Sequence, residues 1–245
     1  MERKNKFFSI IILLLLLTEL AAQQTKEYKI DEVVVTASRI PMNYSKLLRT
    51  VSVINSFDIK KLPVNNIQDL LQHVGAVDLR ARGVEGVQAD AGIRGGTFEQ
   101  TLILIDGVKI IDPQTGHNNL NLPISLDNVE RIEVLKGEGS RMFGANAFSG
   151  AVNIITKKSK APLLSFSALG GQNALFETNL FGTYPIGFTG NNFYFSKKKS
   201  DGYRYNTGFE ITNFSAGQNI FLEEGIINFL FGYTDKKFGA YNFYS

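Results

Sequence analysis

Few side chains in this sequence could carry out covalent chemistry. Its 245 residues include two histidines and no cysteine, which excludes disulfide frameworks, cysteine-ligated metals and thiol catalysis. Ser140 has neither the G-x-S-x-G turn of a hydrolase nor a nearby histidine. Gly137 and Gly139 begin a dinucleotide fingerprint, but Met142 occupies the position of its third glycine. We therefore expect no catalytic residue, no metal site and no cofactor, and predict that the chain is not an enzyme.

The charge balance also narrows the possible partners. There are 26 Lys and Arg residues against 23 Asp and Glu, a formal net charge of +3. A nucleic-acid binder normally carries a marked basic excess. We therefore expect no nucleic acid as a partner.

The first 22 residues have the pattern of a secretory signal peptide. Arg3, Lys4 and Lys6 precede an apolar run over residues 7–17, and small residues end at Ala22, where we expect cleavage. The alternative is a membrane anchor, for which this apolar run is short compared with about 20 helical residues. The mature chain is therefore predicted to leave the cytoplasm.

Residues 41–160 mix helical and strand patterns within a compact unit. Ser56 can cap a short helix that ends at Pro63, and Asn66 can cap a second helix before Gly75. Asp106-Gly107 is a turn pair. Strands are predicted over residues 50–54, 102–105, 129–135 and 152–156.

Residues 161–245 show a different sequence pattern, which contains no helix signal. Apolar and polar side chains alternate along several long runs, with glycine-containing or polar turns between them. Runs of this kind are typical of transmembrane β-strands, which are apolar toward lipid and polar toward the lumen. A soluble β-sandwich is the alternative. The apolar positions include Leu164, Phe166, Phe176, Leu180, Phe193, Phe195, Ile227, Phe229, Phe231 and Tyr233.

Three consecutive valines stand between the signal peptide and the first packed element, within residues 31–37. They favour an extended backbone. The segment either offers an unpaired strand to a partner by strand addition or forms the first strand of the domain's own sheet.

Several motifs then follow in a fixed order. The sequence reads IRG at residues 93–95, LILIDGV at 102–108, NVERIEVLKG at 128–137, and FG at 143–144 before GAVNIIT at 150–156. Together they resemble the plug domain of TonB-dependent outer-membrane receptors, and the valine segment resembles the TonB box. Glu138 and Phe143 depart from the family pattern, which usually has Pro and Tyr there.

The resemblance implies an α+β plug domain followed by antiparallel β-strands of an incomplete transmembrane β-barrel of about 22 strands. The segments expected are a signal peptide (1–22), a TonB-box segment (23–40), the plug (41–160) and the first barrel strands (161–245). The partners implied are a TonB-type periplasmic energy transducer, a small-molecule nutrient and outer-membrane lipid, with a monomeric barrel when complete.

The resemblance also implies site residues. The TonB-binding residues are Glu32, Val33, Val34, Val35 and Thr36. The loops at 80–92 and 110–122 are expected to point outward and touch ligand through Arg82, Glu85, Gln88, Asp112, Gln114, His117 and Asn118. Contacts between plug and barrel are expected from Arg94, Glu130, Arg131, Glu133 and Arg141. The alternative for each of these is a solvated surface side chain. His117 has no second histidine or carboxylate at metal-ligand spacing.

The implied function is energised uptake of a scarce, bulky nutrient, a corrinoid or ferric siderophore, across the outer membrane. A barrel of about 22 strands needs on the order of 440 residues. We therefore expect the chain to be a fragment or the product of an interrupted gene. The alternative function is that of a plug-type β-protein that binds a ligand or partner without transporting it.

Overall fold

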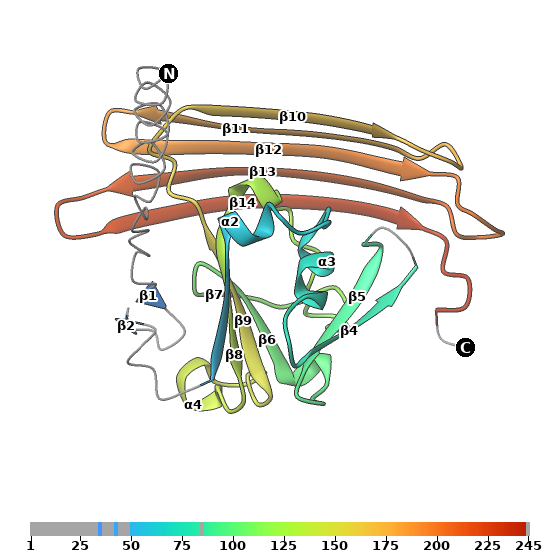
Figure 1. Cartoon of the computed structure of the whole chain (residues 1–245), viewed down its shortest axis with the longest axis horizontal. Coiled ribbons are helices and arrows are strands. Elements are labelled where there is room, and N and C mark those ends of the chain that lie inside the picture. The colour runs from blue at the N-terminus through green and yellow to red at the C-terminus, as the bar shows by residue number, and fades with distance from the viewer. Residues whose placement is uncertain (1–33, 36–41, 44–49, 84–85, 244–245) are drawn as a thin grey trace, which may run out of the picture. The chain divides into compact units, whose positions relative to one another are not determined.

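Two groups of strands make up most of the described chain (Figure 1). The computed structural model describes residues 34–35, 42–43, 50–83 and 86–243. The early strands are β1 (Val34–Val35), β2 (Met42–Asn43), β3 (Val51–Asn55), β4 (Val77–Arg82), β5 (Gln88–Ile93), β6 (Thr101–Ile105), β7 (Val108–Ile110), β8 (Val129–Lys136) and β9 (Gly150–Thr156). The later strands are β10 (Leu163–Gly170), β11 (Phe176–Ile186), β12 (Thr189–Ser200), β13 (Phe209–Phe221) and β14 (Ile226–Phe238). The helical elements are α2 (Ser56–Ile59), α3 (Ile67–Gln72), η2 (Phe98–Gln100), η3 (Leu126–Asn128) and α4 (Ser140–Phe143).

The first group folds around a five-stranded sheet of order β3-β8-β9-β6-β7, which we call the plug sheet. The pair β6–β9 is parallel and the other pairs are antiparallel. Its core contains Leu70 and Leu71 from α3 together with Ile93, Ile132 and Ile154, each fully buried. Because these side chains come from distant segments, the hydrophobic effect joins the helices to the sheet. The strands predicted over 50–54, 102–105, 129–135 and 152–156 are confirmed.

The helix starts follow capping rules. Asn66 accepts a hydrogen bond from the Asp69 backbone N–H at 2.8 Å, which confirms the predicted cap of α3. The prediction for α2 was wrong by one residue. Asn55 rather than Ser56 is its cap, because the Asn55 side chain accepts from the Asp58 N–H at 2.9 Å.

The predicted loop over residues 80–92 is also wrong. Most of it forms the arms of a hairpin, in which β4 pairs with β5 from Val77↔Ile93 to Arg82↔Gln88. The strand β5 reads QADAGI and every residue in it is buried. Small residues at alternate positions let it pack closely, which explains why it shows no apolar signal of a strand.

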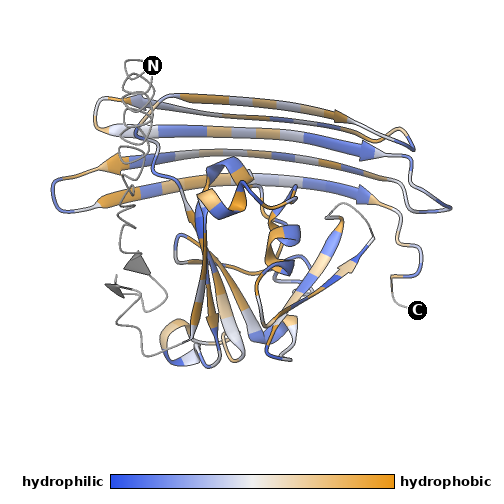
Figure 2. Cartoon of the chain, in the orientation of Figure 1, coloured by the Kyte–Doolittle hydropathy of each residue, from blue (hydrophilic) through white to orange (hydrophobic). Residues whose placement is uncertain are grey.

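The second group is a consecutive antiparallel sheet of order β10-β11-β12-β13-β14, which we call the wall. Alternate residues on each strand point to opposite faces. One face presents side chains such as Phe166, Phe229 and Phe231, which are 69%, 59% and 63% exposed. The opposite face carries Ser196, Ser215 and other buried polar side chains. Figure 2 shows this alternation of hydropathy along the strands. The amphipathic strands predicted after residue 160 are confirmed.

Glycine is required where the plug sheet meets the hairpin. Gly150 has φ of +155°, and a Cβ there would lie 2.3 Å from the Leu135 carbonyl oxygen and 2.8 Å from Ile93 Cδ1. The Asp106-Gly107 turn between β6 and β7 also has positive φ at both residues, as a two-residue type I′ hairpin turn needs.

We expect Gly150→Ala to destabilise the protein by about 2 kcal/mol or more, because the backbone conformation and the close oxygen both oppose a methyl group. Gly75→Ala is the matched control, since no heavy atom lies within 4 Å of its Cβ position. Urea unfolding followed by circular dichroism measures both. Equal midpoints for the two variants would contradict this account of Gly150.

Candidate functional site

The two segments predicted to touch ligand meet at a buried carboxylate. Asp90 in β5 is 5% exposed. It forms an ion pair with Arg82 from β4. Its Oδ1 lies 3.0 Å from Nδ1 of His117, which stands in the loop after β7; we call residues 112–122 of this predicted loop the 112–122 loop. The His117 ring also packs against Phe98, with centroids 4.3 Å apart. The structure therefore brings Arg82 and His117 together on Asp90.

Asp90 was missed by the sequence analysis. Its only signal is an acidic residue within a run of small buried residues, which needs a partner that the local sequence does not supply. The partners are Arg82 across the hairpin and His117 from a distant loop.

Asp112 organises its own loop. Its carboxylate accepts hydrogen bonds from the Gln114 backbone N–H at 3.0 Å and from the side chains of Thr115 and Asn118 at 3.1 Å each. The backbone hydrogen bond from Gln114 is the largest cause that lowers the pKa of Asp112 from its ordinary value. Desolvation opposes it, and the side-chain hydrogen bonds from Asn118 and Thr115 add to the lowering. Asp112 and Asn118 therefore shape the loop, and Gln114 is exposed on it.

The remaining residues that were predicted to touch ligand differ in solvent exposure and in position. Gln88 is 5% exposed within β5, so it is not on an outward loop as predicted. Glu85 lies outside the described residues. Arg82 ends β4 and also donates from Nε to the Phe243 carbonyl oxygen at 3.1 Å.

The charges predicted to face the barrel have varied surroundings. Arg131 donates to Glu130 and Glu133, both at 2.8 Å, so these three residues form an ion-pair cluster on β8. Arg94 and Arg141 are exposed on the described plug surface. Contacts of these residues with barrel strands stay a prediction.

Other residues join the plug to the wall. Lys236 of β14 donates to the carbonyl oxygens of Gly86 and Val87, at 2.9 and 3.3 Å, and to Asn121 Oδ1 at 2.6 Å. Ser165 of β10 donates to the Asp127 carboxylate at 2.9 Å. Sequence reasoning could identify these wall residues as lumen-facing from the alternation, but not their partners.

Lys157 stands where the plug leads into the wall. Its ammonium donates to the Asp127 carbonyl oxygen at 2.6 Å. Desolvation by burial, aided by the charge of Lys60, lowers the pKa of Lys157. This contact and the Ser165 bond fix η3 against the start of β10.

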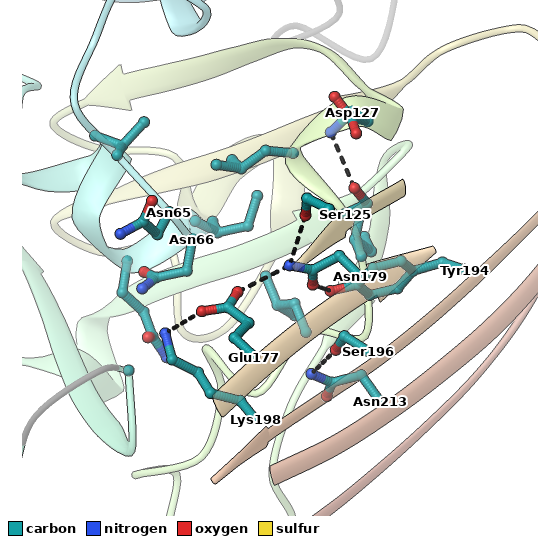
Figure 3. Close-up of a pocket in the computed structure, with 18 of the residues that line it drawn as sticks. Asn65, Asn66, Ser125, Asp127, Glu177, Asn179, Tyr194, Ser196, Lys198 and Asn213 are labelled. Carbon is teal, nitrogen blue, oxygen red and sulfur yellow. Dashed lines mark hydrogen bonds and ion pairs between the residues drawn. The ribbon is translucent and has the colours of Figure 1, made fainter. Parts of the chain in front are cut away.

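A cavity of about 470 Å³ lies between the plug and the wall (Figure 3). Its wall side carries the Glu177–Lys198 ion pair at 2.8 Å, with both side chains less than 15% exposed. Asn179 donates to Glu177 at 2.9 Å and accepts from the Tyr194 hydroxyl at 3.3 Å. Asn213 donates to Ser196 at 3.0 Å. The wall side of the cavity is therefore polar, whereas its plug side includes apolar side chains such as Leu62, Leu122 and Ile124.

The two ends of the wall differ. Residues 187–188 and 222–225 make short turns at one end, and longer loops at 171–175 and 201–208 lie at the other. The hairpin lies at the long-loop end, where Val87 packs with Phe209 and Ile211 of β13. A second cavity of about 370 Å³ lies at this end, lined by residues that include Arg80, Arg82, Tyr203, Arg204 and Tyr241.

The valine segment is described only at Val34–Val35. There β1 pairs antiparallel with β2 in a separate two-stranded sheet and does not join the plug sheet. The other predicted TonB-binding residues, Glu32, Val33 and Thr36, lie outside the described residues, as does the predicted signal peptide.

In the part of the chain that the structure describes, no helix has the length and apolar character to cross a membrane. No group of three or more His, Cys, Asp or Glu residues there could hold a metal ion. A folded α+β unit against the polar face of an amphipathic antiparallel sheet is the arrangement expected in the class of plugged β-barrel proteins.

Comparison with known proteins gives the family. Residues 44–151 match the model of the TonB-dependent receptor plug domain. The vitamin B12 transporter BtuB of Vibrio vulnificus is 30% identical over 190 residues, which cover 77% of this chain and 30% of the transporter. BtuB of Vibrio cholerae is 33% identical over 148 residues, covering 60% of this chain and 24% of that protein.

Solved structures agree on the fold. The pyoverdine outer membrane receptor FpvA of Pseudomonas aeruginosa matches with a TM-score of 0.65 at 17% identity, covering 83% of this chain and 30% of that receptor. The ferric yersiniabactin uptake receptor FyuA of Yersinia pestis matches with a TM-score of 0.60 at 15% identity, covering 77% and 31%. The chain belongs to the TonB-dependent receptor family, with a plug domain followed by antiparallel barrel-type strands. It spans 24–30% of the length of the curated relatives reported above.

We expect Asp90→Asn to lower the free energy of unfolding by about 2 kcal/mol or more, because it weakens a buried ion pair and the link to His117. Asp78→Asn is the control. It removes the partner of Arg80 in a pair whose side chains are 57% and 76% exposed, for which about 0.5 kcal/mol or less is expected. Denaturant unfolding measures both, and equal losses would refute the assignment of Asp90 as the junction.

Proposed function

We propose that this chain serves the energised uptake of a corrinoid across the outer membrane, as the plug and first wall strands of a TonB-dependent receptor. The observation that carries the proposal is the position of the hairpin and the 112–122 loop, joined through Asp90 at the long-loop end of the wall. Outer-membrane barrels have their longer loops outside the cell. The names of the curated relatives support a corrinoid as ligand.

The outer membrane is the proposed location. The exposed aromatic face of the wall suits contact with lipid, and the polar face suits a filled lumen. The proposed segments are a signal peptide over 1–22, a TonB-box segment over 23–40, the plug over 41–160 and barrel strands over 161–245. The proposed receptor is a monomeric barrel.

In the proposed mechanism, one part of the protein binds ligand and another part binds the energy transducer. Ligand binds at the hairpin and the 112–122 loop, and a TonB-type periplasmic transducer adds a strand to the valine segment. Pulling on that segment displaces the plug from the wall. Several of the contacts between plug and wall are hydrogen bonds, and much of their energy is recovered by solvation as they break. A dry apolar interface of similar size would resist displacement more strongly.

A ferric siderophore is the second candidate ligand. The cavity at the long-loop end favours it, because Arg204 lies 4.6 Å from the centre of the Tyr241 ring and Arg80 and Arg82 line the same space. Guanidinium groups and aromatic rings together suit an anionic ligand with planar groups.

Uptake of radiolabelled cyanocobalamin by the native bacterium tests the proposal. Deleting the reading frame is expected to reduce uptake under corrinoid limitation, and restoring it is expected to recover uptake. Uptake of a labelled ferric siderophore in the same strains tests the second candidate. If the deletion changes neither uptake, the transport proposal fails.

We expect Val34→Pro to abolish energised uptake while leaving ligand binding at the cell surface intact, because proline lacks the N–H that strand addition requires. Val34→Thr is the matched control, since threonine keeps β-branching and the backbone donor. Binding and uptake are measured in the same cells. Loss of both activities in Val34→Pro would point to a folding defect and contradict the assigned role.

A further inference from the structure

A single ammonium group connects the wall to both candidate ligand-binding segments. Lys236 lies near the long-loop end of β14, on the face of the wall toward the plug. Its Nζ donates to Gly86 and Val87 in the hairpin and to Asn121 in the 112–122 loop. The segments that it contacts are therefore distant from it in sequence and from each other.

The number of bonds matches the chemistry of lysine. An ammonium has three donors and no acceptor. Lys236 directs these donors at three oxygens, two of them backbone carbonyls and one an amide oxygen, none of which carries a charge. Hydrogen bonds to a charged donor are stronger than neutral ones. Arginine has a planar fork of donors that does not suit three convergent oxygens.

The contacts of Lys236 continue into the loop. Asn121 donates to Asn118 at 3.0 Å, and Asn118 donates to Asp112 at 3.1 Å. The hairpin and loop are also joined at Asp90 and His117. Lys236 thus forms a second junction between the hairpin and the loop. Of these two junctions, only the one at Lys236 includes a residue of the wall.

We propose that Lys236 is a positioning residue that fixes the hairpin and the 112–122 loop against the wall and thereby sets the affinity for ligand. This inference rests on the proposed function, in which these two segments touch ligand. A site whose elements are held in place before binding loses less conformational entropy when ligand arrives. Release of the same three bonds frees both segments from the wall together.

The neighbouring lysine provides a matched control. Lys237 follows Lys236 on β14 and therefore points to the other face of the wall. It is exposed, and it pairs across the strands with Glu210 rather than with Ile211, the partner of Lys236. Lys236→Met and Lys237→Met remove the same charge from adjacent positions with little change in length.

Hydrogen exchange on the native receptor in detergent, without ligand, tests the positioning role directly. We expect Lys236→Met to speed amide exchange in residues 86–93 and 112–121 by about tenfold or more, because each segment loses at least one hydrogen bond to a charged donor. Lys237→Met is expected to leave it unchanged. Unchanged protection of β6 in both variants shows that the plug is folded. Equal exchange in Lys236→Met and wild type would overturn the proposal.

A double-variant cycle separates a specific contact from a general structural defect. Asn121→Ala removes one acceptor of Lys236, so its effect on exchange in the 112–121 segment is expected to be largely absent when Lys236 is already methionine. Simple addition of the two effects would overturn the contact.

Cyanocobalamin uptake provides the functional measurement. Lys236→Met is expected to raise the half-saturating concentration by about tenfold at an unchanged maximal rate. A folding defect would instead lower the maximal rate, and that result would overturn the positioning role. If wild-type receptor neither binds nor imports cyanocobalamin, the proposed ligand is wrong, and hydrogen exchange alone then decides for or against the positioning of the two segments.

Discussion

The alternation of side chains along β10–β14 is the constraint on which the rest of the structure depends. A strand turns successive residues to opposite faces, so one sequence specifies an apolar face and a polar face at once. The apolar face is exposed in the described structure, with Phe166, Phe229 and Phe231 among its members. The polar face must be covered by something that can form hydrogen bonds. This requirement explains why the plug contacts the wall through carbonyl oxygens, carboxylates and amides.

The interior of the plug and its surface toward the wall therefore have different energetic roles. Its interior is apolar, with Leu70, Leu71 and Ile132 fully buried, and provides its stability. Its surface toward the wall combines hydrogen bonds, such as those accepted from Lys236, with the apolar contact of Val87 with Phe209 and Ile211. This surface borders the cavity beside the Glu177–Lys198 ion pair. Under the proposed function the plug would separate from the wall as a unit, because its core lies within the domain and its hydrogen bonds to the wall can be replaced by bonds to water.

The sequence predicted those features that depend on neighbouring residues. The Asn66 cap, the Asp106-Gly107 turn and the alternation of the wall strands are local patterns, and the structure confirms them. The hairpin over 77–93 was missed because two of the three core-facing residues of β5 are alanines, Ala89 and Ala91, which give only a weak apolar signal. Asp90 and Lys236 were missed for another reason. Their partners are distant in sequence, and no spacing rule brings residue 236 beside residues 86 and 121. Family motifs identified the plug, but they mark its turns and core more than its contacts.

The position of the two junctions has a consequence for how the receptor would couple binding to release. Asp90 joins hairpin and loop within the plug, whereas Lys236 joins both to the wall. Movement of the plug away from the wall would break the second junction and leave the first intact. The hairpin and loop would then keep their mutual arrangement but lose their common support. Under the proposed function, the affinity for ligand would fall at that moment, because the wall would no longer hold the hairpin and the loop in place. Release of ligand would thus follow from plug displacement itself and would need no separate signal.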